Sequence, residues 1–433
     1  MQAPRPMSRT SRRAVAWAGV LTAAIALGPW PAAAEEAPPS NKNRPGTYQV
    51  KTSHAGYNYY VCVPPSYSPD NPAGIHLFFH GQGGGGSAPQ FGQWSKYFLE
   101  PYNLIGINMQ YEDGDNAKDT GGKVEAAEEA LRQVAADYKI VSGRGAVGCF
   151  SGGALPQQRL FEQYKAHAAG GPAPCPFNHA SLYGSNYRGG LTRLPPMTWF
   201  IGLGSEEWNL ANLGETQTDR AAELLAAALK GGCPDAYLKI TKGKGHAVSD
   251  EDVRDSAAGF RRSDLLLAPF LCEADYPEAA LAPIVKQANA QALGKAAAAV
   301  ARAAAGAKDA ALKAKAEAIG KRIEARVDAI LALARELADT DPVLCGYYGT
   351  LWARGLAAHP KAKDLKALLA EAEKRPNRKA ALAAYGQFCT TFKHMFQSNT
   401  LNPEAAAFLE DARAKAGEKS LLGKMAAEFL LLR

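Results

Sequence analysis

Ser151 stands in a stretch whose residue types could activate a hydroxyl group. It ends a short apolar run, residues 144–150, and two glycines follow it before an amphipathic pattern of helical period over 154–165. A serine between a buried strand and a helix is typical of a nucleophile elbow, a turn so sharp that only small residues fit two places on either side. Cys149 stands where the usual pattern has glycine, and a Ser-Gly-Gly turn also occurs in ordinary loops. The stretch therefore predicts a candidate nucleophile that needs partners.

A base and an acid for this serine are found further along the chain, in an order that suits the chemistry. His246 ends a glycine-rich loop after an apolar run, and Glu206 and Glu207 follow another such run that ends at Gly204. Serine needs an imidazole to take its proton, and the imidazole needs a carboxylate that fixes its tautomer and stabilises its charged form. We expect His246 to be the base and Glu207 the acid. The neighbouring Glu206 stays open as the alternative.

Predicted strands and helices alternate around these residues. Short links join them, which predicts an α/β protein with a mostly parallel sheet and helices on both faces. In such a sheet the carboxyl ends of the strands share one crevice, and Ser151, the glutamates and His246 all follow strand ends. The predicted strands are 57–63, 75–79, 104–109, 144–150, 180–183, 197–203 and 236–241, and the predicted helices are 124–138, 154–165, 216–230 and 250–271.

A glycine-rich loop, His80 to Gly86, follows the predicted strand 75–79. Glycine removes side chains and lets the backbone approach a ligand closely, as the N–H donors of an oxyanion hole must. We expect His80 to shape this turn. A phosphate-binding loop is the weaker interpretation because the Lys-Ser/Thr ending is missing, and a plain flexible linker is the remaining alternative.

Together these motifs resemble an α/β-hydrolase-fold serine esterase over residues 57–271. The similarity is strongest to the exported polyhydroxybutyrate depolymerase and feruloyl or acetylxylan esterase-like group. The resemblance implies Ser151 as nucleophile, His246 as base and Glu207 as acid. It also implies an oxyanion hole formed by the backbone N–H groups of Gln82 and Gly152. The segments that carry it are 79–83, 149–153, 204–207 and 243–246.

Residues 1–34 have the pattern of an export signal. Four arginines precede an apolar stretch, residues 14–27, and a small-residue cleavage site of the A-x-A kind ends at Ala34. The arginine pair at 12–13 also resembles a twin-arginine signal. The stretch is too short for a membrane span and no cysteine stands at the cleavage point, so we expect a secreted or periplasmic protein without a stable membrane anchor. Removing four arginines from a net charge of +7 leaves 7 − 4 = +3, too little to indicate nucleic-acid binding.

The chain has seven cysteines, all beyond the predicted signal. An oxidising compartment allows disulfides, and an odd number leaves at least one thiol, for which Cys149 on the central strand is our choice. Cys233 with Cys272 and Cys345 with Cys389 are guesses from proximity alone. No Cys/His cluster indicates a metal, so we predict neither metal nor organic cofactor.

The composition changes at about residue 275 to Ala, Lys, Glu and Leu, which favour helix. We predict a lead-in segment over 35–56, a hydrolase domain over 57–274 and a separate region of about six helices over 275–433. Residues 295–339 read as helix interrupted at Gly306 and Gly320. A polymer, the cell envelope or a protein could be the partner of these helices, or they could act only as a spacer.

Three functions stay open at this point. The resemblance implies cleavage of a carboxylic ester, either in a small molecule or in a polymer, through an acyl-enzyme intermediate. The alternatives are a peptidase or amidase of the same fold, and an inactive hydrolase-like domain whose helical region binds a partner.

Overall fold

The computed structural model describes residues 45–81, 91–111, 118–168, 175–185, 197–209, 217–230, 233, 235–391, 395–397 and 400–432. All of them belong to one compact unit, residues 33–433. Over these ranges, no helix combines the length and the apolar character needed to cross a bilayer.

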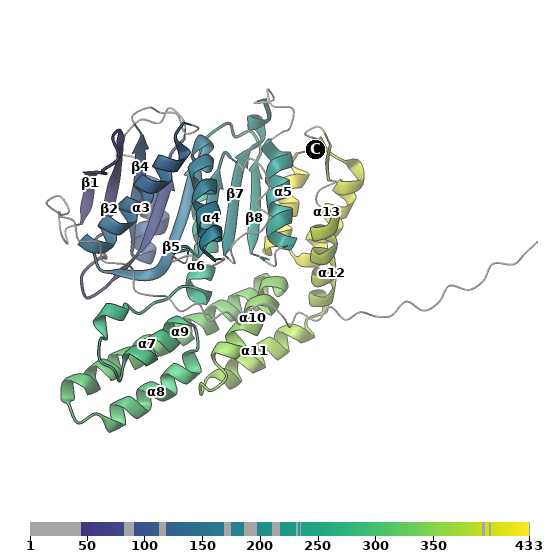
Figure 1. Cartoon of the computed structure of the whole chain (residues 1–433). Helices are drawn as coiled ribbons and strands as arrows, with labels where there is room; N and C mark the ends of the chain where they lie inside the picture. Colours follow the sequence, from purple (N-terminus) through teal and green to yellow (C-terminus); the bar gives the residue numbers. More distant parts are fainter. Residues whose placement is uncertain are drawn as a thin grey trace, which may run out of the picture. The chain divides into compact units, whose positions relative to one another are not determined.

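An eight-stranded sheet forms the centre of the molecule (Figure 1). Its order is β1-β2-β4-β3-β5-β6-β7-β8, with β1–β2 and β2–β4 antiparallel and all other pairs parallel. β3, β4, β6 and β7 are buried along their whole length, which explains their nearly continuous apolar sequences. The strands are β1 (Gly46–Lys51), β2 (Tyr57–Val63), β3 (Ala73–Phe79), β4 (Leu104–Tyr111), β5 (Ile140–Phe150), β6 (His179–Tyr183), β7 (Thr198–Gly204) and β8 (Ala236–Thr241).

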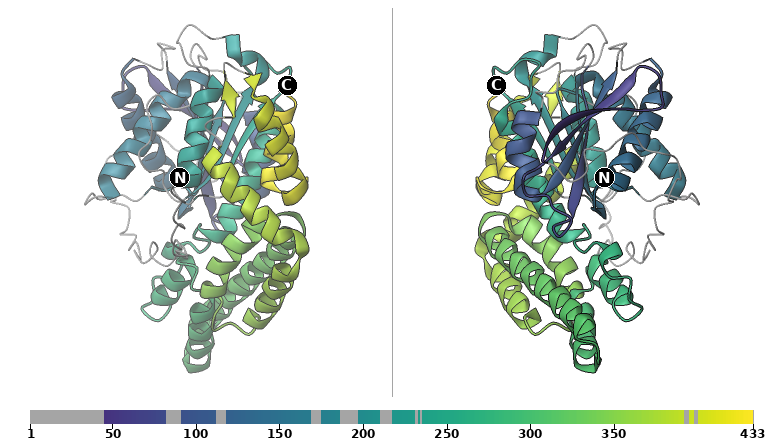
Figure 2. Two further views of the ribbon diagram at one scale, coloured as in Figure 1. Left: turned by 90° about the vertical axis from the view of Figure 1, so that its right-hand side faces the viewer. Right: turned by 90° about the vertical axis from the view of Figure 1, so that its left-hand side faces the viewer.

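Helices cover both faces of this sheet, as the alternating sequence predicts (Figures 1 and 2). One face carries α3 (Thr120–Asp137), α4 (Ala154–Ala168) and α5 (Gln217–Lys230). The other carries α6 (Asp250–Leu266) and the short consecutive turns α1 (Phe91–Trp94), η2 (Ser95–Leu99) and α2 (Glu100–Tyr102). The lead-in segment supplies β1, which takes the edge position and leaves β2 inside the sheet.

Eight α-helices follow, where the sequence suggested about six. Gly306 ends α8, as expected from the weak helix propensity of glycine, but α9 runs through Gly320 without a break. A two-stranded ribbon of β9 (Phe396–Gln397) and β10 (Thr400–Leu401) interrupts the series. The helices are α7 (Ala282–Asn289), α8 (Leu293–Gly306), α9 (Ala310–Thr340), α10 (Pro342–Gly355), α11 (Ala362–Lys374), α12 (Pro376–Thr391), α13 (Pro403–Ala416) and α14 (Leu421–Leu430).

Two hydrophobic cores divide these helices into two groups. α7 to α11 enclose a core of their own, together with the end of α6. Residues of α12, α13 and α14 belong to the core of the sheet, and α14 packs against β8. Figure 2 shows these last helices beside the sheet and α7 to α11 beyond one end of it. The expected domain boundary at residue 275 stays a prediction, but the cores assign residues 376–430 to the sheet.

Buried polar contacts join α7–α11 to the amino ends of the strands. Asp235, one residue before β8, receives two hydrogen bonds of 2.6 Å from the guanidinium of Arg262, and the hydroxyl of Tyr348 on α10 also donates to it. Arg326 on α9 donates to the backbone carbonyls of Asp264, in the last turn of α6, and Ala268, just after it. Helices α7 to α11, called the helical group below, therefore lie at the end of the sheet opposite the carboxyl ends of its strands.

Candidate active site

Ser151 occupies the turn from β5 to α4 with a strained backbone. Its φ of 51° lies in the left-handed region, which residues other than glycine rarely adopt. A single 3₁₀ turn, η3 (Ser151–Gly153), joins the strand to α4. A serine held in this conformation at the carboxyl end of a central strand has the geometry of a nucleophile elbow.

Close packing explains the small residues on both sides of this turn. A side chain at Gly153 would collide with the carbonyl oxygen atoms of Phe79 and His80 at the end of β3. Cys149 is fully buried, and its thiol donates a 2.9 Å hydrogen bond to Oε1 of Gln157 on α4. Burial raises the pKa of this thiol well above its usual value, so the sulfur is an inert space-filling group. Cysteine thus replaces glycine here without opening the turn.

His246 and Glu207 meet as the sequence predicts. Nδ1 of His246 donates to Oε2 of Glu207 at 3.0 Å. The imidazole is 36% exposed and the carboxylate only 1%, so one partner faces solvent and the other lies within the protein. Oε1 of Glu207 accepts a 2.8 Å hydrogen bond from the backbone N–H of Gly204. A buried carboxylate fixed in this way determines which imidazole nitrogen is left for chemistry.

The choice between the two glutamates follows from the turn that carries them. Both lie in η4 (Ser205–Asn209), directly after β7. The side chain of Glu206 is exposed, and its backbone N–H donates to the carbonyl of Lys244 at 3.0 Å. Glu206 therefore ties the two loops together through its backbone, whereas Glu207 reaches the imidazole.

Phe150 connects this pair to the elbow. Its ring centroid lies 4.7 Å from that of His246, and Ser151 is the next residue along the chain. Among the described residues, no hydrogen bond joins the hydroxyl of Ser151 to His246. The structure thus brings the imidazole and the carboxylate into contact and sets the serine next to the residue on which the imidazole rests. Catalytic hydrogen bonds are often long in the absence of substrate.

Of the two expected oxyanion-hole residues, the structure describes only Gly152. Gly152 follows the nucleophile within η3, two residues before α4 begins. Gln82 lies outside the described residues. His80 is buried, and its Nδ1 donates to the carbonyl of Gly81 at 2.5 Å, which fits the expected role in shaping this turn.

The sequence analysis missed an ion pair that supports the histidine loop. Nζ of Lys244 lies 2.6 Å from Oδ2 of Asp252, which is fully buried. The same carboxylate forms a capping box with Ser249 at the start of α6. The S-x-x-D spacing before the α6 helix was a visible signal for the cap, but nothing in the sequence pointed to the lysine.

The cysteines are not paired with one another. All seven are thiols in the structure, so the guesses of Cys233 with Cys272 and Cys345 with Cys389 are wrong. Those guesses relied on proximity along the chain, but the two sulfur atoms of each guessed pair lie in different surroundings. The thiol of Cys272 faces the carbonyl of Ile140, and that of Cys345 faces the carbonyl of Ala334. Within the described ranges, no group of three His, Cys, Asp or Glu side chains could hold a metal ion.

No protein-family model matches this chain, and no curated protein is significantly similar to it. Solved structures do resemble it. A thermostable esterase is 12% identical, with a TM-score of 0.35 over 50% of this chain and 59% of that one. An acetyl xylan esterase from Aspergillus awamori is 13% identical (TM-score 0.35, 49% of this chain, 99% of that one). Poly(aspartic acid) hydrolase-1 from Sphingomonas sp. KT-1 is 14% identical (TM-score 0.37, 49% of this chain, 97% of that one).

The strand order, the helices on both faces and the strained serine after β5 decide the fold. The chain has the α/β-hydrolase fold. The predicted fold class is confirmed, including the helical region that follows the sheet.

Proposed function

We propose that this protein is a serine hydrolase that cleaves carboxylic esters, with Ser151, His246 and Glu207 as its catalytic triad. The contact between the exposed imidazole and the buried carboxylate of Glu207, against the residue that precedes Ser151, carries the proposal. An imidazole held by a buried acid and packed on the residue before a strained serine can perform general-base chemistry with a small movement. Two of the similar structures named above are esterases, the class of enzyme proposed here.

The first half of the reaction forms an acyl-enzyme. As Oγ of Ser151 attacks the ester carbonyl carbon, Nε2 of His246 takes the hydroxyl proton. Glu207 stabilises the imidazolium through Nδ1. The backbone N–H groups of Gly152 and Gln82 bind the developing oxyanion, and loss of one such donor costs on the order of a hundredfold in rate or more. When the tetrahedral intermediate collapses, the carbon–alkoxy bond breaks and the imidazolium gives its proton to the leaving alcohol.

The second half releases the acid. A water molecule gives a proton to His246 while its oxygen bonds to the acyl carbon. Collapse then breaks the bond to Oγ, and the imidazolium returns the proton to Ser151. No net proton or electron is consumed, and the chain needs no metal or organic cofactor for any step.

Reaction with a fluorophosphonate tests the nucleophile directly. We expect the intact chain to gain one phosphonyl group, mapped to Ser151 by peptide mass spectrometry, and the Ser151→Ala variant to gain none. A folded wild-type chain that stays unlabelled would support the inactive binding module instead. Turnover of a p-nitrophenyl ester, compared with a p-nitroanilide of the same acyl group, separates an esterase from an amidase.

We further propose that the protein is exported. The support is the sequence of residues 1–34, which lie outside the described residues. Fusing residues 1–40 to a reporter enzyme that is active only outside the cytoplasm should give activity in a bacterial host. Replacing both Arg12 and Arg13 with Lys should stop export if the twin-arginine route is used, and leave it intact if the general route is used.

A further inference from the structure

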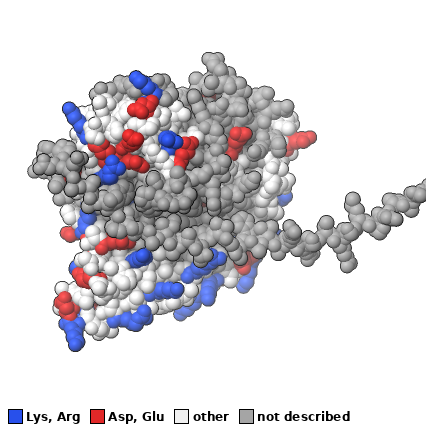
Figure 3. Space-filling model, in the orientation of Figure 1, with Lys and Arg blue, Asp and Glu red and all other residues white. Residues whose placement is uncertain are grey.

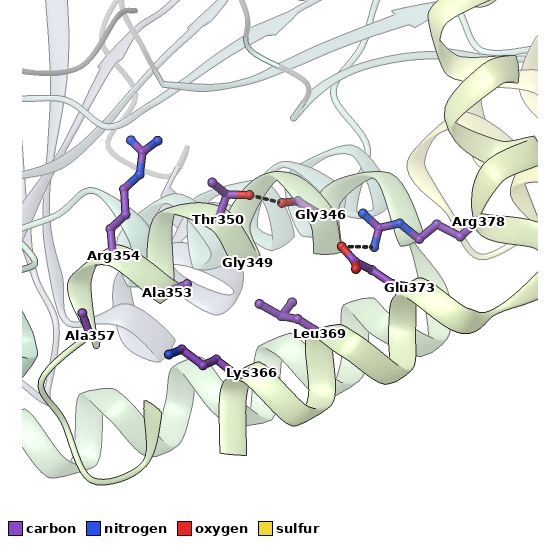
Figure 4. Close-up of a pocket in the computed structure, with 10 residues that line it drawn as sticks. All are labelled: Gly346, Gly349, Thr350, Ala353, Arg354, Ala357, Lys366, Leu369, Glu373 and Arg378. Atoms are coloured by element: carbon purple, nitrogen blue, oxygen red, sulfur yellow. Dashed lines mark hydrogen bonds and ion pairs between the residues drawn. The ribbon is translucent and has the colours of Figure 1, made fainter. Parts of the chain in front are cut away.

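A cavity of about 520 Å³ lies between α10 and α11, and the start of α12 borders one end of it (Figure 4). It is remote from the candidate active site, because α10 contacts the amino ends of the strands through Tyr348 and Asp235. The triad residues all follow carboxyl ends. The cavity is therefore a separate feature of the helical group.

Small residues on one face of α10 form the floor of this cavity. Gly346, Thr350 and Ala353 on α10 and Ala357, two residues after it, succeed one another at intervals of four, three and four residues, so they lie on one side of this stretch. The guanidinium of Arg378 lies over Gly346 at one end, whereas the short side chains of Thr350, Ala353 and Ala357 leave the rest of this face open to close approach. Leu369 on α11 supplies an apolar wall. A second helix with short side chains could therefore pack closely here.

Basic side chains line the edges of the cavity. Arg354, Lys366 and Arg378 contribute three positive charges against one carboxylate, Glu373. Arg378 is paired with this carboxylate at 3.5 Å. Neither the guanidinium of Arg354 nor the ammonium of Lys366 has an ion pair or a hydrogen bond to any residue that the structure describes. The cavity thus offers two uncommitted cations.

The surrounding helices share this positive charge. Residues 342–391 contain eight Lys and Arg against three Asp and Glu, a net charge of 8 − 3 = +5. The chain without its predicted signal has only +3, so the remaining residues sum to 3 − 5 = −2. Figure 3 shows Lys and Arg gathered on the lower part of the molecule, over the helices below the sheet. This concentration of charge favours a negatively charged partner.

The positions of the cations indicate the shape of that partner. In Figure 4, the side chains of Arg354 and Lys366 both lie toward the Ala357 end of the cavity, on different helices, and their charged ends point apart; Arg378, which is paired with Glu373, lies at the other end. A single phosphate would need the two uncommitted cations to converge on one point, whereas an extended ligand can place a separate negative group against each of them. None of the described lining residues is aromatic, so bases and sugar rings find no stacking surface.

We infer that this cavity receives an acidic helical segment of a partner protein. Short apolar side chains of the segment would lie over the small residues of α10 and against Leu369. Its Asp or Glu side chains would reach Lys366 and Arg354. Helix-in-groove recognition of this kind combines apolar contact along one helix face with charges at the rim. The site works independently of ester cleavage.

Binding of a designed peptide to the full chain tests this inference. The probe is a helix-forming peptide of about 15 residues of Glu, Ala and Leu, with Glu at positions i, i+4 and i+7 of one face. The control replaces every Glu with Gln. By fluorescence anisotropy at low salt, we expect the Glu peptide to bind at least tenfold more tightly than the control, with weaker binding as salt rises.

Matched variants separate this cavity from general attraction to positive charge. Lys366→Glu should weaken binding by about tenfold, because it replaces an attraction with a repulsion at the rim. Thr350 is exposed, so Thr350→Trp should block the cavity without disturbing the core and should weaken binding similarly. Lys295→Glu reverses an equally exposed lysine on α8, outside the cavity, and should leave the affinity within twofold.

Several results would overturn the inference. These are no binding of the Glu peptide, equal effects of Lys366→Glu and Lys295→Glu, or tighter binding of single-stranded DNA or an acidic polysaccharide than of the peptide. Turnover of a p-nitrophenyl ester should be unchanged in all three variants. A wild-type protein that turns over the ester but does not bind the peptide would contradict this inference alone. A wild-type protein that binds the peptide but does not turn over the ester would contradict the proposed function alone.

Discussion

The two ends of the sheet use buried polar groups for opposite purposes. At the amino ends, Asp235 is buried, its partner Arg262 is only 16% exposed, and the pair joins the helical group to the sheet. At the carboxyl ends, Glu207 is buried but its partner His246 is exposed to solvent. An ion pair in which both side chains are shielded from solvent can only hold elements together. A pair in which one side chain is exposed can also exchange protons with a substrate or with water. Solvent exposure of one partner therefore distinguishes the candidate active site from the structural contact at the amino ends, called the joint below.

The largest effect should follow from removing the nucleophile. Ser151→Ala should lower kcat for a p-nitrophenyl ester by about ten-thousandfold or more, because no other group can form the acyl-enzyme. Thr350→Trp, at the other end of the molecule, should leave kcat unchanged. Circular dichroism should show both variants folded. Residual turnover above about one per cent in Ser151→Ala would contradict the assignment.

The next effect should separate the two neighbouring glutamates. Glu207→Gln keeps the size of the side chain but removes the charge that stabilises the imidazolium, so kcat should fall by about a hundredfold to ten-thousandfold. Glu206→Gln should stay within twofold, since Glu206 contacts the histidine loop only through its backbone N–H. Steady-state kinetics on both variants provide the comparison. Equal losses would show that both carboxylates act on the site.

The joint at the amino ends should be the most sensitive site for stability. Asp235→Ala leaves the mostly buried Arg262 and the buried hydroxyl of Tyr348 without their carboxylate and should lower the free energy of unfolding by about 3–5 kcal/mol. Asp328 makes an ion pair of 2.6 Å with Lys361 in the helical group, but its side chain is 62% exposed. Asp328→Ala should therefore cost less than about 1 kcal/mol. Urea denaturation measures both, and similar costs would remove the contrast between buried and exposed pairs.

The smallest effect concerns acid sensitivity, which we expect to originate in the sheet. Burial lowers the pKa of His76 on β3 to about 3, from 6.5. Below pH 6.5, His76 binds a proton in the unfolded chain but stays neutral in the folded chain. The free energy of unfolding therefore falls by about 1.4 kcal/mol per pH unit between these two values.

His76→Leu should remove this part of the pH dependence. Between pH 7 and pH 5, the wild type should lose about 2 kcal/mol more than the variant in urea denaturation. His179 is also buried, and its pKa is likewise lowered mainly by burial, so some acid sensitivity should remain in both proteins. Identical losses would mean that His76 is protonated in the folded state.

Much of the fold could be predicted because local sequence patterns determine it. The run 57–63 became β2, and the run 236–241 became β8. Asp341 and Asn402 cap α10 and α13 before a proline in the first turn, as their sequences indicate. The contact of His246 with Glu207 was predictable because both follow parallel strands whose carboxyl ends meet.

The features that were missed depend on contacts between distant residues. Nothing local distinguishes α14, which packs on β8, from α8, which packs on other helices. The thiols of Cys272 and Cys345 each lie against a backbone carbonyl, and sequence separation carries no information about this. The partner of Lys244 is eight residues away on the following helix, so only the folded loop reveals the ion pair.

The placement of the α10–α11 cavity at the far end of the sheet has an evolutionary consequence. Substitutions among its rim residues alter no residue that lies near the serine or the imidazole. With the two proposed roles kept apart in this way, descendants of this protein can change the protein that they recruit without changing the reaction, and can lose the reaction without losing the recruited protein.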